Sequence, residues 1–173
     1  MDIKQKIRSL PDWPIKGVIF RDITTLMLDP DAFRETCDQL YNRYKNMKID
    51  KIVAIDARGF IFGAVLAYKL NVGLVPVRKK GKLPPETISQ DYELEYGTNI
   101  VEISTTGISP GEKVLIIDDL IATGGTIYAA IKLVEKLGGE IIECGFIVEL
   151  PDLRGKDKIK GYKMFALTEF EGE

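Results

Sequence analysis

A short apolar run followed by two acids and a turn of small residues, residues 114–126, constrains the fold of this chain more than any other segment. Its β-branched residues 114–117 are typical of a central parallel strand that is buried on both faces. We expect Asp118 and Asp119 to lie just after this strand, at its carboxyl end. Residues 127–137 then carry apolar side chains at helical spacing, and two glycines follow them. A strand, a loop and a helix in this order predict an α/β protein.

The turn after the two acids has the properties of an anion site. Its small residues, 123–126, let backbone N–H groups approach an anion where a helix begins and the helix dipole favours negative charge. Two adjacent carboxylates beside a buried strand are unfavourable unless hydroxyl groups, a cation or water satisfy them. Taken separately, the acids fit a solvated strand end and the glycines fit an ordinary tight turn. Together they favour a sugar-phosphate site, and the sequence contains neither G-x-x-x-x-G-K-[ST] nor G-x-G-x-x-G.

Composition excludes several classes of protein. The chain has 173 residues, 45% of them hydrophobic, which suits one domain with a substantial core. It contains no histidine, so Ser-His-Asp and Cys-His catalysis and His-based zinc sites are excluded. Its two cysteines, Cys37 and Cys144, lie among apolar residues far apart in the sequence, which favours buried reduced thiols and a cytoplasmic location.

Charge and hydropathy argue against nucleic acid and a membrane as partners. A formal net charge of −2 argues against a general nucleic-acid-binding protein, which usually has an extended basic surface. The N-terminus lacks the apolar core of a signal peptide, and no run approaches the roughly 20 apolar residues of a membrane span. We therefore expect neither nucleic acid nor a membrane as a partner.

Positive charge is concentrated after the apolar residues 72–77, which we expect to form a strand. Residues 78–82 (RKKGK) carry this charge, and the prolines that follow exclude a helix. Such a charge run is often only a solvated loop. Because the chain is acidic overall and the anion site needs positive charge nearby, we favour a mobile basic flap over a polyphosphate.

Further strands and helices alternate along the chain. Asp29 and Pro30 give one helix an N-cap and a proline at its first position. We expect strands at residues 51–56 and 140–148, and a hairpin at residues 89–103. This alternation predicts a mostly parallel central sheet with helices on both faces.

Arg58 stands where the expected helix 60–70 begins. A cation is unfavourable at this end of a helix dipole unless an anion joins it. The anion is either the side chain of Asp56 or a bound ligand. Ligands of such sheets bind beyond the carboxyl ends of the strands, where Asp56, Arg78 and Asp118 would converge.

Residues 114–126 closely resemble the signature for 5-phosphoribosyl 1-pyrophosphate (PRPP) in type I phosphoribosyltransferases. The resemblance implies that the acids contact the ribose 2- and 3-hydroxyls and that the loop binds the 5-phosphate. It also implies one α/β domain over residues 1–173, with a small N-terminal base-binding hood (1–25) and a flexible basic loop and hairpin (78–103).

Three other segments resemble the adenine-specific branch of that family. They are residues 14–23 (PIKGVIFRDI), 78–84 (RKKGKLP) and 92–97 (YELEYG), in the same order and with similar spacing. The resemblance implies transfer of the 5-phosphoribosyl group from PRPP to adenine N9, giving AMP and pyrophosphate through an oxocarbenium-like transition state.

Each candidate site residue takes its role from this resemblance. Asp118 and Asp119 are expected at the ribose, and Ala122, Thr123, Gly124, Gly125 and Thr126 at the 5-phosphate. The residues expected at the pyrophosphate are Asp56, Arg58, Gly59, Arg78, Lys79 and Lys82. Those expected at adenine are Ile19, Phe20, Arg21 and Leu150, and the expected catalytic residues are Glu95, for the purine proton, and Arg58.

Two of these residues have an equally simple structural interpretation. From its apolar neighbour alone, Phe20 would be a core residue rather than a stacking platform for a base. Glu95 could be an exposed hairpin carboxylate rather than a group that handles a proton.

Cofactor and partners also follow from the resemblance. Magnesium is expected, held mainly by PRPP oxygens and water, with no dedicated protein metal cage. A homodimer is expected, with Arg21 and residues 58–62 near the interface. Two alternatives remain: an enzyme for a 6-oxopurine, and a non-catalytic PRPP-sensing regulator. A regulator would be expected to carry a DNA-binding extension or a strongly basic face.

Overall fold

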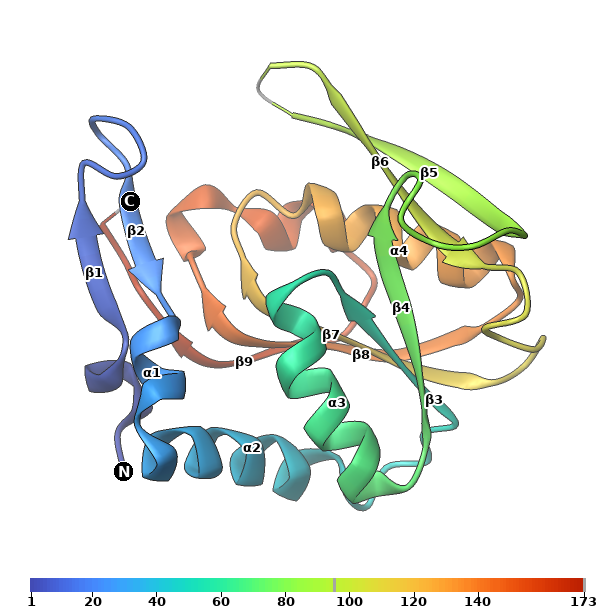
Figure 1. Cartoon of the computed structure of the whole chain (residues 1–173), viewed down its shortest axis with the longest axis horizontal. Coiled ribbons are helices and arrows are strands. Elements are labelled where there is room, and N and C mark those ends of the chain that lie inside the picture. The colour runs from blue at the N-terminus through green and yellow to red at the C-terminus, as the bar shows by residue number, and fades with distance from the viewer. Residues whose placement is uncertain (95, 173) are drawn as a thin grey trace.

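A central seven-stranded sheet organises the chain in the computed structural model, which describes residues 1–94 and 96–172. Its strands are β3 (Lys51–Ile55), β4 (Gly73–Lys79), β5 (Thr87–Glu93), β6 (Thr98–Ser104), β7 (Lys113–Ile121), β8 (Glu140–Glu149) and β9 (Met164–Glu169). Their order across the sheet is β5-β6-β4-β3-β7-β8-β9 (Figure 1). Five neighbouring strands are parallel to one another: β4, β3, β7, β8 and β9. Strand β6 runs antiparallel to both β4 and β5. The predicted mostly parallel sheet is therefore confirmed.

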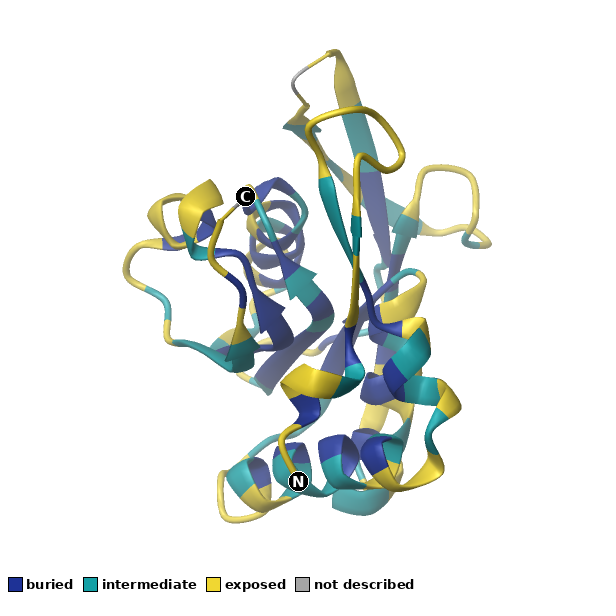
Figure 2. Ribbon diagram, turned by 90° about the vertical axis from the view of Figure 1, so that its left-hand side faces the viewer, coloured by how far each residue is buried: buried dark blue, intermediate teal, exposed yellow. Residues whose placement is uncertain are grey.

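Helices cover both faces of this sheet. They are α1 (Thr24–Leu28), α2 (Pro30–Tyr44), α3 (Arg58–Leu70) and α4 (Gly125–Lys136), with short 3-10 helices η1 (Ile3–Lys6), η2 (Pro151–Leu153) and η3 (Gly155–Ile159). Along β7, Val114 and Ile116 pack with the core under α4, whereas Leu115 and Ile117 pack with the core under α2 and α3. This alternation buries the strand on both sides, as its apolar sequence predicts. Figure 2 shows that buried residues, in dark blue, gather in the interior of the molecule.

Two strands extend beyond their predicted limits. The predicted strand 114–117 continues to Ile121, so Asp118 and Asp119 lie inside β7 near its carboxyl end rather than after it. The reason is that β8 continues to pair with β7 past the apolar run. Likewise Arg78 and Lys79 belong to β4 rather than to a loop, because β6 pairs with that end of β4.

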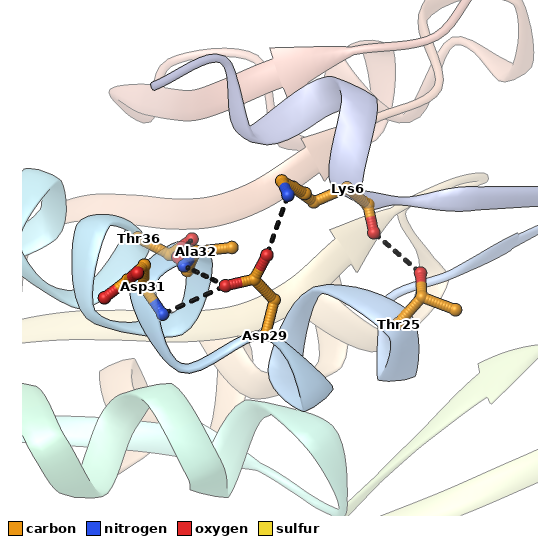
Figure 3. A network of polar contacts seen from close by, with 6 residues as sticks. All are labelled: Lys6, Thr25, Asp29, Asp31, Ala32 and Thr36. Atoms are coloured by element: carbon orange, nitrogen blue, oxygen red, sulfur yellow. Dashed lines mark hydrogen bonds and ion pairs between the residues drawn. The ribbon is translucent and has the colours of Figure 1, made fainter.

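The N-terminal segment forms a separate two-stranded antiparallel sheet of β1 (Arg8–Pro11) and β2 (Ile19–Asp22), at the opposite end of the molecule from the β5–β6 hairpin (Figure 1). A polar network fixes its base to α2 (Figure 3). Lys6 Nζ pairs with Asp29 Oδ2 at 2.7 Å, and Thr25 Oγ1 donates a hydrogen bond to Lys6 O at 2.7 Å. Asp29 Oδ1 accepts hydrogen bonds from the backbone N–H groups of Asp31 and Ala32, which confirms it as the helix N-cap.

Both cysteines are free and buried, as predicted. Burial raises the pKa of the Cys37 thiol to about 11 and that of Cys144 to about 12. Neither thiol therefore has the lowered pKa of a reactive cysteine.

Candidate active site

One cavity of about 280 Å³ opens where three neighbouring parallel strands end. It lies among residues 55–58 at the end of β3 and just after it, residues 77–79 at the end of β4, and residues 118–127 at the end of β7 and the start of α4. Tyr92, Val101 and Phe146 complete its wall. The sheet thus places three distant parts of the sequence around one space.

Most of the predicted phosphate and ribose residues line this cavity. They are Asp56, Arg58, Arg78, Lys79, Asp118, Asp119, Ala122, Thr123, Gly124, Gly125 and Thr126. The other predicted residues lie outside its lining: Gly59, Lys82, Ile19, Phe20, Arg21 and Leu150. Glu95 falls outside the residues that the structure describes.

The two acids of β7 differ in their surroundings. Asp119 has a side chain only 7% exposed, and its Oδ2 accepts a hydrogen bond from Arg58 Nε at 2.5 Å. Asp118 Oδ1 accepts a hydrogen bond from the Asp119 backbone N–H at 2.8 Å. Burial, and then the adjacent Asp119 charge, raise the pKa of the Asp118 carboxyl well above its ordinary value. Asp119, which is buried and paired, is therefore not part of a solvated strand end.

A second ion pair lies in the same cavity. Arg78 Nε pairs with Asp56 Oδ2 at 2.9 Å, and Arg78 Nη1 donates a hydrogen bond to Lys82 O at 3.3 Å. The alternative in which Asp56 is the partner of Arg58 is therefore wrong, because Asp119 occupies that role. The cavity is therefore lined by two carboxylate–guanidinium pairs, and their arginines are the kind of side chain that binds anions.

The loop after β7 has a backbone built for an anion. Gly124 has φ +85°, a left-handed conformation that favours glycine, and it is the N-cap of α4. The first N–H groups of a helix have no partner within the helix, so those that follow Gly124 are available to a ligand. Tyr92 packs closely against this turn: a Cβ on Gly125 would lie 3.1 Å from Tyr92 Cδ2.

Gly59 has a clear packing role. A Cβ at this position would lie 2.9 Å from the Ile117 carbonyl oxygen and 3.0 Å from Asp118 Oδ1. The absence of a side chain therefore lets the start of α3, with Arg58, lie directly against β7. Contact of Gly59 with a pyrophosphate stays a prediction.

The predicted adenine residues lie in two places: Ile19, Phe20 and Arg21 are on β2 of the two-stranded sheet, and Leu150 is in the core. Phe20 is half-buried on β2, and its ring packs edge-to-face against Trp13 with centroids 4.6 Å apart. Over the described part of the chain, neither hydrophobic core cluster includes Phe20, so the core interpretation of this residue is wrong. Leu150 is 6% exposed and packs within the core that α2 and α3 cover. The Arg21 guanidinium lies over the Phe170 ring.

Several residues of the cavity lining were not predicted as site residues, among them Tyr92, Val101, Phe146 and Ala57. Tyr92 belongs to the YELEYG segment of the hairpin, so its position in a site-related motif was the available signal. Val101 and Phe146 lie inside apolar strands and carry no chemical signal of their own. Ala57 lies between Asp56 and Arg58, and only its neighbours could have indicated it.

Comparison with known proteins decides the family. A phosphoribosyl transferase domain matches residues 27–172. A curated adenine phosphoribosyltransferase from Desulfosudis oleivorans is 65% identical over 173 residues, covering 100% of both chains. The chain belongs to the adenine phosphoribosyltransferase family. Its fold, activity class and specificity branch are therefore those that residues 114–126 and the three adenine-type segments predict.

Adenine phosphoribosyltransferases of known structure share the whole fold. The enzyme from Thermoanaerobacter pseudethanolicus aligns with a TM-score of 0.94 at 51% identity, covering 98% of both chains. The enzyme from Saccharomyces cerevisiae, solved in complex with an imino-altritol bisphosphate and adenine, aligns with a TM-score of 0.90 at 40% identity, covering 96% of both chains.

Proposed function

We propose that this protein transfers the 5-phosphoribosyl group of PRPP to N9 of adenine, giving AMP and pyrophosphate with inversion at C1. One observation carries this proposal: most of the predicted ribose, phosphate and pyrophosphate residues, which lie at or after the ends of β3, β4 and β7, line a single cavity of about 280 Å³. The reaction serves purine salvage, since it converts a free base into a nucleotide.

The acids and the loop at the end of β7 hold the donor. Asp118 and Asp119 accept hydrogen bonds from the ribose 2- and 3-hydroxyls, and residues 122–126 bind the 5-phosphate through backbone N–H groups and the start of α4. These contacts fix the sugar so that C1 faces the incoming base. Positioning of this kind removes much of the entropic cost of a reaction between two substrates.

The cations of the cavity stabilise the leaving group. When the C1–O bond breaks, its electron pair goes to pyrophosphate while positive charge develops on the ribosyl ring, and N9 then bonds to C1. Arg58 and Arg78 lie in the cavity, paired with Asp119 and Asp56. They bind the pyrophosphate together with Asp56, Gly59, Lys79 and Lys82.

The base binds under the hood of residues 1–25. Phe20 stacks on adenine, Leu150 closes the other face of the ring, and the backbone of residues 19–21 binds its edge. Glu95, outside the described residues, accepts the purine proton at N7. Residues 78–103 cover the site when it closes and keep water from the donor.

Magnesium fits this site mainly through the substrate. Carboxylate oxygens suit Mg²⁺, and Asp118 and Asp119 provide them, although Asp119 is already paired with Arg58. Within residues 1–94 and 96–172, no group of three or more His, Cys, Asp or Glu side chains could hold a metal ion. As part of the proposal, PRPP oxygens and water would hold Mg²⁺, which would neutralise charge on the pyrophosphate.

A homodimer in the cytoplasm is part of the proposal. Ile61 and Tyr68 project from one face of α3, 38% and 86% exposed, and Leu74 of β4 is also 38% exposed. A second copy of the chain would cover this apolar face. Among the described residues, no helix is long and apolar enough to cross a bilayer.

The test is AMP formation from PRPP, Mg²⁺ and adenine, beside hypoxanthine, guanine, xanthine and uracil in separate reactions. Selective product formation with adenine supports the proposal. Preference for another base would keep the PRPP site and refute the base assignment. Tight PRPP binding without turnover on any base would favour a sensor.

A further inference from the structure

We propose that Gly155, outside the cavity and some thirty residues after the phosphate loop, is a positioning residue for that loop. The inference rests on the proposed function, because it takes residues 122–126 as the 5-phosphate site. Gly155 would not contact the substrate, and it would instead fix the conformation of the loop by packing against its backbone.

The backbones of the loop and of η3 touch at two glycines. A Cβ on Gly124 would lie 2.6 Å from the Gly155 carbonyl oxygen and 3.1 Å from its Cα. In the other direction, a Cβ on Gly155 would lie 2.5 Å from the Ala122 carbonyl oxygen and 2.8 Å from Ile121 Cγ1. Real Cβ atoms essentially never approach other atoms this closely, so a side chain at either position forces a backbone shift.

Contact, and not backbone conformation, excludes a side chain at position 155. Gly124 has φ +85°, whereas Gly155 is the first residue of a 3-10 helix and lies outside the positive-φ region. An alanine could therefore adopt the backbone conformation of Gly155. Its methyl group would meet the Ala122 carbonyl, at the start of the phosphate loop.

The segment around Gly155 is anchored, so the loop is the part expected to yield. Ile159, at the end of η3, is 2% exposed and packs in the core with α4. Lys156 Nζ pairs at 3.0 Å with Glu149 Oε1, whose side chain is 9% exposed. Arg154 pairs with Asp157 at 2.7 Å across the first turn of η3. These contacts hold Gly155 in place against residues 122–124.

A displaced Ala122 carbonyl would redirect the N–H groups that follow it. These groups bind the 5-phosphate only when they converge on one point, so a small shift weakens PRPP binding. Adenine binds elsewhere, against the hood, so its affinity should change little. The inference therefore predicts a defect confined to one of the two substrates.

The test compares Gly155→Ala with Gly145→Ala in steady-state AMP formation. Gly145 is a matched control: it is a buried glycine of β8 whose added Cβ would lie 2.5 Å from Tyr44 Oη, away from the loop. Both variants should lower the thermal midpoint. Only Gly155→Ala should raise the KM for PRPP, by about tenfold or more, with the KM for adenine within about twofold of wild type.

Thr123→Val separates failure of the inference from failure of the proposed function. If Thr123→Val raises the KM for PRPP but Gly155→Ala does not, or if Gly145→Ala raises it equally, the positioning role is refuted and the site stands. If neither Thr123→Val nor Gly155→Ala alters PRPP binding, the assignment of residues 122–126 to the 5-phosphate fails, and the inference fails with it. Should Gly155→Ala not fold, Ile159→Val replaces it by loosening η3, and an unchanged KM for PRPP would overturn the inference.

Discussion

Arg58 Nε donates a hydrogen bond to Asp119 Oδ2 at 2.5 Å, joining the first residue of α3 to the carboxyl end of β7. The guanidinium is half exposed, whereas the carboxylate is 7% exposed. The acid that we propose to bind ribose and the cation that we propose to bind pyrophosphate therefore pair with each other. Burial lowers the pKa of Arg58, but its hydrogen bond to Asp119 and the nearby acids outweigh that effect, so the net shift is upward. The guanidinium therefore stays charged.

Replacing Arg58 should damage turnover more than adenine binding. In Arg58→Ala the leaving pyrophosphate loses a cation and Asp119 loses its partner, so we expect kcat to fall by about a hundredfold. Steady-state kinetics with each substrate varied in turn measure this effect. A variant with normal kcat and only a raised KM for adenine would contradict the assignment.

Asp118 should make stability depend on pH in a direction opposite to that of a salt-bridged acid. Its pKa is raised in the folded state, so as pH rises above the ordinary value of 3.8 the unfolded chain releases this proton first. The contribution of the protonated Asp118 carboxyl to folding stability is fully present below pH 3.8, and it is lost as the pH rises through the raised pKa. Asp118→Asn should remove that loss and melt at a higher temperature than wild type at pH 7, while losing activity.

Thermal melts at pH 4 and pH 7 measure this difference, with Asp91→Asn, at an exposed position of β5, as the control. A gap between Asp118→Asn and wild type that does not grow with pH would show that the Asp118 carboxyl has no raised pKa.

Phe20 should affect one substrate only. If adenine stacks on its ring, Phe20→Ala should raise the KM for adenine by about tenfold, since base–aromatic stacking is worth about 1–3 kcal/mol. The KM for PRPP should not change, because Phe20 lies outside the cavity lining. Trp13→Ala is the paired control, removing the ring that supports Phe20. Equal defects with both substrates in Phe20→Ala would indicate a folding role instead.

Asp29 should stabilise the base of the hood in two separable ways (Figure 3). Asp29→Asn keeps an oxygen for the N–H groups of Asp31 and Ala32 but loses the ion pair with Lys6, whereas Asp29→Ala loses both. We expect the thermal midpoint to fall in the order wild type, Asp29→Asn, Asp29→Ala. Lys6→Met should match Asp29→Asn. If Asp29→Ala melts like Asp29→Asn, the helix cap contributes nothing.

Local chemistry made much of the fold and site predictable. The apolar residues of β3 and β7, the N-cap at Asp29 and the glycine-containing turn before α4 each carry a strong local signal. Because parallel strands bring their carboxyl ends together, these signals also placed Asp56, Arg78 and Asp118 in one cavity.

The remaining features depend on contacts between residues far apart in the sequence, which the local sequence pattern does not reveal. The ends of β4 and β7 are set by pairing with β6 and β8, and β9 lacks the fully buried apolar pattern of the central strands. The partner of Arg58 depends on how closely α3 approaches β7, which Gly59 permits. The contact of Gly155 with the phosphate loop is likewise visible only in three dimensions.

The most direct test of the site is a crystal structure of the protein with AMP bound. We expect the ribose hydroxyls within hydrogen-bond distance of Asp118 and Asp119, the phosphate on the N–H groups of residues 122–126, and the adenine ring against Phe20. A nucleotide whose phosphate lies away from this loop, or whose base does not contact the hood, would contradict it.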